Sequence, residues 1–194
     1  MLKIILASKS KVRKKILDKY NIFNEVKPSN IDEDVVKLSL LKEKASPEMI
    51  SKNLAELKAN KISEKYSDNL VLGADSVIDL DGELISKPEN RQKALEILKK
   101  LNGKKHNLIS SVCISKNGSM VWNHTDKATL TMKKMSEDEI KSYLATISDE
   151  TLYAYNVYQI EGKGRNLFLS IDGNENTIMG LPVEKIKKYL DNYK

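Results

Sequence analysis

The stretch that decides the fold is residues 70–88, LVLGADSVIDLDGELISKP. It predicts a strand over 70–80, a tight turn at Asp81-Gly82, a short return strand, and an exit through Lys87-Pro88 into a helix. The strand is apolar enough to be buried on both faces, yet Asp75 stands at its middle. Because burying an unpaired carboxylate is costly, an ionised Asp75 needs a cation beside it.

Two interpretations of Asp75 follow from this stretch. In the first, the carboxylate is structural and pairs with a neighbouring Lys or Arg, or accepts hydrogen bonds from the backbone. In the second, it is a metal ligand or a general base, held on a rigid strand where small neighbours, Gly73 and Ala74, let a ligand approach. Residues elsewhere in the chain bear on this choice.

Length and composition predict one globular domain over residues 1–194, since 194 residues at 40% hydrophobic content can bury a sizeable core. The one cysteine, Cys113, cannot form an internal disulfide, and its apolar neighbours predict a buried strand position. No stretch approaches the ~20 apolar residues of a membrane span, and the N-terminal apolar run is too short for a secretion signal. We therefore expect a soluble, cytoplasmic protein.

The charge balance is basic, with a formal net charge of +6. Arginines occur only at positions 13, 91 and 165, and most lysines are scattered between acids along predicted helix faces, which is typical of a solvated surface. A nucleic-acid binder should show clustered basic residues with aromatics or bidentate arginines, so we expect no nucleic-acid partner. The net charge is still compatible with a modest positive field that attracts a small polyanion.

The N-terminal segment predicts a place for an anion. Residues 3–7 predict the first strand, and residues 11–20 predict a helix with one apolar face. Between them, Ser8-Lys9-Ser10 would present backbone N–H groups and the positive end of the helix dipole to an anion. Arg13 lies in the first turn, where a cation is unfavourable unless an anion faces it; the alternative is an exposed arginine or a surface ion pair.

After a short strand near residues 24–27, we expect residues 28–46 to be irregular. This segment contains three consecutive acids, at positions 32–34, which usually mean a solvated loop. A long loop beside a strand end is also where ligand-binding groups are commonly mounted.

A long helix is predicted from Ser46-Pro47 to about Tyr66, because Ser is a good N-cap and Pro suits the first helical position. Its apolar stripe contains Ile50, Leu54, Leu57 and Ile62. Lys58 falls in the same column, so its ammonium either points along the buried face or extends to the edge of the stripe.

The second half of the chain predicts a long hairpin among helices. The expected elements are a helix over 89–101, strands over about 106–116 and 120–132, a helix opened by a capping box at 136–139, a strand over 167–172 and a helix over 182–193. Asn117-Gly118 is the strongest short hairpin signal in the chain. His106 and His124 lack partners at metal-ligand spacing, so no histidine metal site is expected.

Glu161 is a further candidate for ligand binding. It ends an alternating run just where Gly162 and Gly164 give the backbone freedom to turn and to approach a ligand closely. The alternative is a surface acid beside a flexible turn.

Three separated segments resemble the Maf-like nucleotide pyrophosphatases, cytosolic enzymes linked by name to septum formation. They are residues 6–13 (LASKSKVR), residues 72–76 (LGADS) with 86–88 (SKP), and residues 161–164 (EGKG) with 180–182 (GLP). They occur in the family's order and approximate spacing across almost the whole chain. The resemblance implies a two-lobed α/β fold with a long mixed sheet flanked by helices and a central cleft, similar to the inosine triphosphate pyrophosphatases.

The resemblance also implies roles for individual residues. Ser8 and Arg13 match a phosphate-binding signature, Glu33 the acid of an Asp-Glu loop, and Lys58 a helix lysine. Asp75 matches the acid assigned as metal ligand or base, and Lys87 the lysine of a Gly-Lys-Pro turn. The expected catalytic residues are therefore Asp75, Lys58 and Lys87, the substrate-binding residues Ser8, Arg13, Lys58 and Lys87, and the metal ligands Glu33, Asp75 and Glu161.

The expected reaction is hydrolysis of a nucleoside triphosphate between its α and β phosphates, giving a nucleoside monophosphate and pyrophosphate. Three carboxylates beside a triphosphate would repel it, and a divalent metal resolves that repulsion. An oxygen-only ligand set favours Mg²⁺ or Mn²⁺. The resemblance further implies a homodimer.

Departures from the family's pattern leave open which nucleobase the substrate carries. Lys11-Val12 stands where Pro-Arg is common, Ser86 replaces a glycine, and Tyr155-Asn156 stands where Ala-Gly is usual. Position 161 is Gln in a branch associated with dTTP and UTP, and Glu in a branch that prefers nucleotides such as 7-methyl-GTP. Ser76, in contrast, resembles the Thr of the first branch.

Two alternative functions are open on sequence grounds. One is a non-catalytic Maf-like regulator that binds nucleotide or nucleic acid and influences cell division. The other is an inosine or xanthosine triphosphatase on the related fold.

Overall fold

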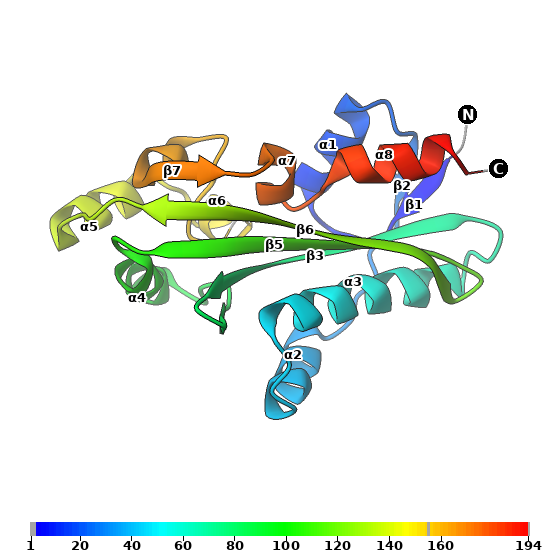
Figure 1. Cartoon of the computed structure of the whole chain (residues 1–194), viewed down its shortest axis with the longest axis horizontal. Helices are drawn as coiled ribbons and strands as arrows, with labels where there is room; N and C mark the ends of the chain where they lie inside the picture. The colour runs from blue at the N-terminus through cyan, green and yellow to red at the C-terminus, as the bar shows by residue number, and fades with distance from the viewer. Residues whose placement is uncertain (1–2, 155, 194) are drawn as a thin grey trace.

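The chain is built on a long seven-stranded mixed sheet with helices on both faces (Figure 1). The computed structural model describes residues 3–154 and 156–193. The strands are β1 (Ile4–Leu6), β2 (Asn24–Val26), β3 (Leu70–Leu80), β4 (Glu83–Ile85), β5 (Lys105–Lys116), β6 (Ser119–Met132) and β7 (Phe168–Asp172). Their order is β2-β1-β3-β5-β6-β7, with β4 paired to β3. The pairs β1–β2 and β1–β3 are parallel and the others antiparallel, so the predicted mixed sheet is confirmed.

The helices follow the predicted pattern in most places. They are α1 (Lys11–Lys19), α2 (Glu33–Lys42), α3 (Pro47–Ser63), α4 (Arg91–Leu101), α5 (Glu137–Ala145), α6 (Asp149–Ala154), the 3-10 helix η1 (Lys163–Leu167), α7 (Glu175–Ile178) and α8 (Val183–Asp191). The Ser46 side chain caps α3, and the capping box at Ser136 and Glu139 is present in α5. Within the described residues, no helix has both the length and the apolar character needed to cross a membrane.

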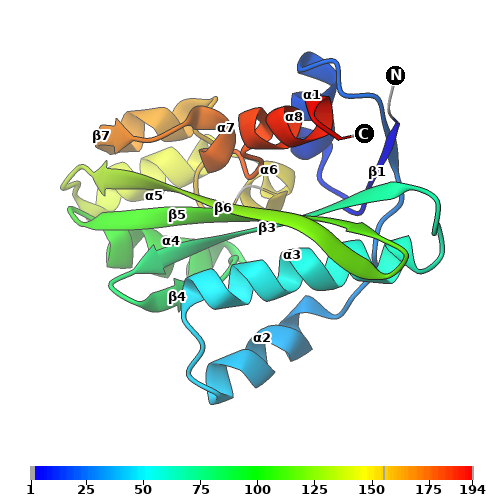
Figure 2. The same ribbon diagram turned by 45° about the vertical axis from the view of Figure 1, so that its right-hand side comes forward.

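The central strand β3 separates two layers of helices. Its residues Leu70, Leu72 and Ala74 join an apolar cluster with α1 and α8 on one face. Gly73 and Asp75 alternate with them and meet α3 on the other face, as the two views of Figures 1 and 2 show for the helices. Because a strand alternates its side chains between faces, β3 is buried on both, as its sequence predicts.

Two apolar clusters divide the molecule into two lobes. One joins β1 to α1, α8 and the first half of β3. The other joins the far ends of β3, β5 and β6 to α4, α5 and the segment around Tyr158. The three long strands run through both lobes (Figure 2), so the predicted two-lobed architecture is confirmed.

The expectation of an irregular segment over residues 28–46 is wrong, because α2 occupies Glu33–Lys42. Asp32 is its N-cap and accepts a hydrogen bond from the Val35 N–H, and the next two acids lie in the first turn, where they favour the helix dipole. The acid run is therefore a helix start rather than a solvated loop. No residue of α2 is buried, and its apolar residues at positions 35, 36, 38, 40 and 41 are spread around the helix rather than gathered on one face, so they give no clear helical signal.

The predicted stripe of α3 holds except at Leu57, which is 42% exposed. The buried column runs instead through Leu54, Lys58 and Ile62, at helical spacing of four. The short helices α6 and α7 and the 3-10 helix η1 were not predicted. Cys113 is buried in β5 as expected, and desolvation raises the pKa of its thiol to about 11.

Candidate active site

A single cavity of about 750 Å³ gathers every site residue that the sequence predicted. Its lining includes Ser8, Arg13, Glu33, Lys58, Asp75, Lys87 and Glu161. These residues come from the loop before α1, from α1, α2, α3 and β3, and from the segments after β4 and α6. Residues up to 153 positions apart in the sequence thus face one space, because the central sheet carries both lobes.

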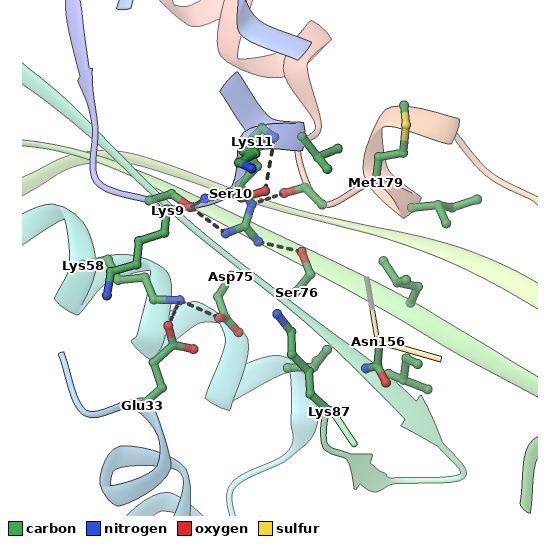
Figure 3. Close-up of a pocket in the computed structure, with 18 of the residues that line it drawn as sticks. Lys9, Ser10, Lys11, Glu33, Lys58, Asp75, Ser76, Lys87, Asn156 and Met179 are labelled. Atoms are coloured by element: carbon green, nitrogen blue, oxygen red, sulfur yellow. Dashed lines mark hydrogen bonds and ion pairs between the residues drawn. The ribbon is translucent and has the colours of Figure 1, made fainter. Parts of the chain in front are cut away.

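Lys58 lies at the centre of the cluster and contacts two carboxylates (Figure 3). Its Nζ is 2.8 Å from Asp75 Oδ1 and 2.9 Å from Glu33 Oε1. The Lys58 and Asp75 side chains are only 6% and 7% exposed. Of the two interpretations of Lys58, the one in which the ammonium points along the buried face is confirmed. Asp75 has the cation partner that its burial demands.

The two carboxylates differ in environment and therefore in acidity. Desolvation raises the pKa of Asp75, although Lys58 and Arg13 oppose this shift. For Glu33, partial desolvation opposes ionisation, but Lys58, with Lys37 and Arg13, outweighs it and lowers the pKa. When the pKa values of two neighbouring acids are shifted in opposite directions, the acid with the raised pKa can exchange a proton while the other stays charged. Here these are Asp75 and Glu33, respectively.

Asp75 also keeps one oxygen unused. Its Oδ2 is buried and has no hydrogen-bond partner among the described residues. A buried carboxylate oxygen without a partner is costly, so a donor or a cation that reaches it is favoured. This oxygen fits either the proton of a water molecule or a hard divalent cation.

Within residues 3–154 and 156–193, no three His, Cys, Asp or Glu side chains lie close enough together to hold a metal by themselves. Lys58 fills the space between Glu33 and Asp75, and the exposed Glu161 carboxylate accepts a hydrogen bond from Gln159 Nε2 at 3.3 Å. The described donors fit a cation held by Asp75 and Glu33 together with ligand oxygens, and do not form a complete protein cage.

Arg13 is half-buried and joins several segments of the chain, which neither of its two sequence interpretations described. Its Nε donates to the Gly180 carbonyl at 2.9 Å, and its Nη1 donates to the Ala74 carbonyl at 2.9 Å and to Ser8 Oγ at 3.3 Å. Its Nη2 donates to Ser76 Oγ at 3.1 Å. Four of its five N–H groups thus donate to other groups of the protein. The positive charge of the guanidinium still acts on the cavity, which Arg13 lines.

The serine side chains of the loop before α1 accept hydrogen bonds from nearby backbone N–H groups and from Arg13. Ser10 Oγ accepts from the Arg13 N–H, and Ser8 Oγ accepts from the Ser10 N–H and from Arg13 Nη1. Because Ser8 Oγ serves as acceptor in both contacts, its own hydroxyl proton is available to a ligand in the cavity. The Ser-Lys-Ser loop therefore contributes a positioned hydroxyl donor.

Lysines give the cavity a positive potential. Lys87 is exposed, yet its ammonium points into the cleft toward Asp75 (Figure 3), and desolvation lowers its pKa, with Arg13 adding to the effect. Four further lysines line the cavity although the sequence predicted no site role for them: Lys9, Lys11, Lys15 and Lys37. The sequence contains a signal for three of these lysines. Lys9 and Lys11 belong to the Ser-Lys-Ser-Lys stretch, and Lys37 follows Glu33 by one helical turn.

Two more lining residues were not assigned a site role by the sequence. Ser76 contacts both Arg13 and Ser110 Oγ, the latter at 2.8 Å. Asn156 follows α6 and lines the cavity. Tyr155, the other half of the departure noted in the sequence, lies outside the described residues.

The fold and the site define the class: an α/β protein whose interlobe cavity combines clustered cations with a buried Lys-carboxylate group, suited to a phosphorylated ligand. The chain belongs to the Maf-like protein family, whose model matches residues 3–193. The resemblance predicted from three short segments is therefore confirmed.

Relatives of known name cover nearly the whole chain. One from Pelagibacter ubique, named nucleoside triphosphate pyrophosphatase, is 70% identical over 187 residues, 96% of both chains. One from Rhizobium etli, named 7-methyl-GTP pyrophosphatase, is 35% identical over 93% of this chain and 91% of its own. Among solved structures, a nucleoside-triphosphatase (dITP/XTP pyrophosphatase) from Mycobacterium abscessus is similar at a TM-score of 0.44 and 12% identity, covering 98% of this chain and 94% of its own.

Proposed function

We propose that this protein is a nucleoside triphosphate pyrophosphatase that needs a divalent metal and releases a nucleoside monophosphate and pyrophosphate. The observation that carries the proposal is the buried Lys58–Asp75 pair with an unused Asp75 oxygen, in a cavity rich in lysines. The names of relatives at 70% and 35% identity support the same reaction.

The proposed roles follow from chemistry and position. Asp75 Oδ2 accepts the proton of the attacking water, because it is the unpaired oxygen of a carboxylate whose pKa is raised by burial. Lys58 keeps Asp75 in place through Oδ1 and prevents repulsion between the two acids. Lys87 and the charge of Arg13 stabilise the leaving pyrophosphate, and the Ser8 hydroxyl donates to a phosphate oxygen.

A bound Mg²⁺ or Mn²⁺ would be held by Asp75 and Glu33, with Glu161 as a further carboxylate on the cavity wall, and would neutralise phosphate charge and acidify a bound water. Hard oxygen donors suit these ions better than softer transition metals. Lys58 would then share its two carboxylates with the ion.

The proposed substrate is a modified or pyrimidine nucleoside triphosphate, which gives the protein a house-cleaning role in the nucleotide pool. The name of the Rhizobium etli relative supports a modified purine, whereas Ser76 supports the pyrimidine branch. The family resemblance also supports a cytoplasmic homodimer. A link to septum formation rests on the family's name alone.

The test is pyrophosphate release from a panel of canonical and modified nucleoside triphosphates with Mg²⁺, with Mn²⁺ and with EDTA. We expect turnover of one or a few nucleotides, with the monophosphate as coproduct, and loss of at least 100-fold in EDTA. Turnover that EDTA leaves unchanged would refute the metal. No turnover of any nucleotide by folded protein would favour the non-catalytic regulator instead.

A further inference from the structure

We infer that the side-chain oxygen of Asn156 accepts a hydrogen bond from an N–H group on the edge of the nucleobase. This inference rests on the proposed function, because its ligand is the base of the nucleotide substrate.

Asn156 lies on the side of the cavity away from Glu33 and Lys58. In Figure 3 it lies on the far side of Lys87 from Glu33 and Lys58. The phosphates are drawn to the lysine-rich end by charge. The base, at the other end of the nucleotide, therefore lies on the side of Asn156.

The surroundings of Asn156 suit a flat aromatic ligand. Ile78, Leu108, Ile178 and Met179 line the same cavity, and the first three belong to the apolar cluster of the second lobe, with Met179 packed against it. An apolar wall with few polar groups is the usual setting for binding a ring and reading its edge.

The Asn156 oxygen has an unmet need for a donor. Its Oδ1 is buried and has no hydrogen-bond partner among the described residues. A buried acceptor without a hydrogen bond destabilises the protein, and a hydrogen bond from a ligand N–H would remove that cost. The last torsion of an asparagine is broad and roughly two-fold, so rotation about it can turn the oxygen toward the cavity.

Neighbouring polar groups are already engaged. The Tyr158 hydroxyl lies 2.9 Å from His106 Nε2, and Gln159 Nε2 donates to Glu161 at 3.3 Å. Among the buried side-chain oxygens described at this end of the cavity, the one of Asn156 is left to accept from a base.

The backbone makes Asn156 a clean position to test. Its φ is +67°, in the left-handed region that glycine adopts freely and that asparagine tolerates better than most residues. Asn156→Gly therefore removes the amide without backbone strain. Asn117, with φ +52° in the β5–β6 turn, offers the same change far from the cavity.

The group recognised is an N–H on the base edge. It is either the ring N–H of a lactam base (uracil, thymine, guanine, hypoxanthine) or the exocyclic amine of adenine or cytosine. Methylating that nitrogen removes the donor while keeping the base. A parent nucleotide and its N-methyl analogue thus form a matched pair of ligands.

The experiment measures Kd by calorimetry for non-hydrolysable α,β-imido triphosphates of each base and for the matching analogues: N3-methyluracil, N3-methylthymine, N1-methylguanine, N1-methylhypoxanthine, N6,N6-dimethyladenine and N4,N4-dimethylcytosine. For the preferred base, we expect the natural protein to bind the parent roughly 10- to 100-fold more tightly than the analogue. Asn156→Gly should weaken binding of the parent by a similar factor and reduce the discrimination to about twofold. Asn117→Gly should leave every Kd unchanged.

The outcomes separate this inference from the proposed reaction. If Asn156→Gly keeps the discrimination, or weakens parent and analogue equally, Asn156 does not read the base. If the Kd pattern is as expected but no pyrophosphate is released from hydrolysable nucleotides, the reaction is wrong and the reading role stands. If no nucleotide binds, both are overturned.

Discussion

Lys58 is the residue on which the site depends, because it is a buried cation with two acid partners. Removing either carboxylate leaves the other to balance the ammonium, whereas removing Lys58 would leave Asp75 buried and unpaired. The arrangement lets Asp75 be ionised inside the protein without a metal. Its second oxygen then stays available for chemistry.

We predict that Asp75→Asn removes most of the activity and leaves the fold intact. The change keeps the side-chain shape but removes the charge and the proton acceptor, so kcat should fall by at least about 100-fold. Glu33 still pairs with Lys58, so the protein should remain folded by circular dichroism. The matched control is Asp79→Asn in the same strand, where the new carbonyl still accepts from the Gly82 N–H. Pyrophosphate release within tenfold of the natural rate would refute Asp75 as the base.

A second prediction concerns pH and His106, which is 2% exposed and whose pKa burial lowers to about 4. Between pH 6.5 and 4 the unfolded chain binds a proton here and the folded chain does not. The free energy of unfolding should therefore decrease as pH falls through this window, by about 3 kcal/mol from this group. Urea unfolding across that range measures the slope.

The control for this effect is His106→Gln, which cannot titrate but keeps a polar partner for the Tyr158 hydroxyl. It should flatten the slope between pH 6.5 and 4. His124→Gln should remove a smaller part, because His124 is partly exposed and its shift is weaker. Equal slopes in the natural protein and His106→Gln would show that other groups cause the acid sensitivity.

Among the elements, the contact between α3 and β3 sets the position of Lys58. A Cβ added to Gly73 would lie 2.1 Å from the Ala55 carbonyl oxygen and 2.7 Å from the Ala59 nitrogen. These are backbone atoms of α3, which cannot move aside as a side chain can. The absence of a side chain at Gly73 therefore lets α3 approach β3 closely enough for Lys58 to reach Asp75.

We predict that Gly73→Ala forces α3 away from the sheet. The free energy of unfolding should fall by about 3 kcal/mol, and kcat/KM by at least about tenfold, because Lys58 moves with the helix. Gly82→Ala is the matched control: its φ is +88° and nothing lies within 4 Å of the added Cβ, so it should cost about 1 kcal/mol and leave activity unchanged. Unfolding in urea and pyrophosphate release give the two readouts. Equal effects of both variants would contradict the close-contact argument.

At the scale of the whole molecule, Arg13 connects parts of the chain that are distant in sequence. Its guanidinium joins the loop before α1, the middle of β3 and the Gly180 carbonyl before α8. Gly180 has φ +94°, which turns the chain toward Arg13. The cavity wall on this side thus depends on one side chain.

We predict that Arg13→Lys destabilises the fold as well as the activity. A lysine cannot reproduce the planar array of N–H groups, and buried carbonyls at Ala74 and Gly180 would lose their donors, so the free energy of unfolding should fall by about 3 kcal/mol. Arg165→Lys, at an exposed ion pair with Glu175, should change it by less than about 0.5 kcal/mol. An Arg13→Lys protein with natural stability and low activity would mean that Arg13 acts mainly on substrate.

Local sequence signals predicted the elements well where their cause is local. The turns at Asp81-Gly82 and Asn117-Gly118 have positive φ at both residues, as such pairs require. The caps at Ser46 and Ser136 start helices as expected. The start of α2, an acid cap with acids in the first turn, has the same residue types as a solvated acidic loop, so the local signal does not distinguish the two.

Local patterning in the sequence predicted the mixed α/β class and the burial of Asp75, because strand alternation, capping and glycine placement act over a few residues. The family resemblance predicted seven of the residues that line the cavity. How those residues pair with one another depends on tertiary contacts. In the folded protein Lys58 lies between Glu33 and Asp75, and the Arg13 guanidinium donates to backbone carbonyls. These pairings depend on how closely α3 and the C-terminal segment pack on β3, and that distance results from the whole core rather than from any short stretch.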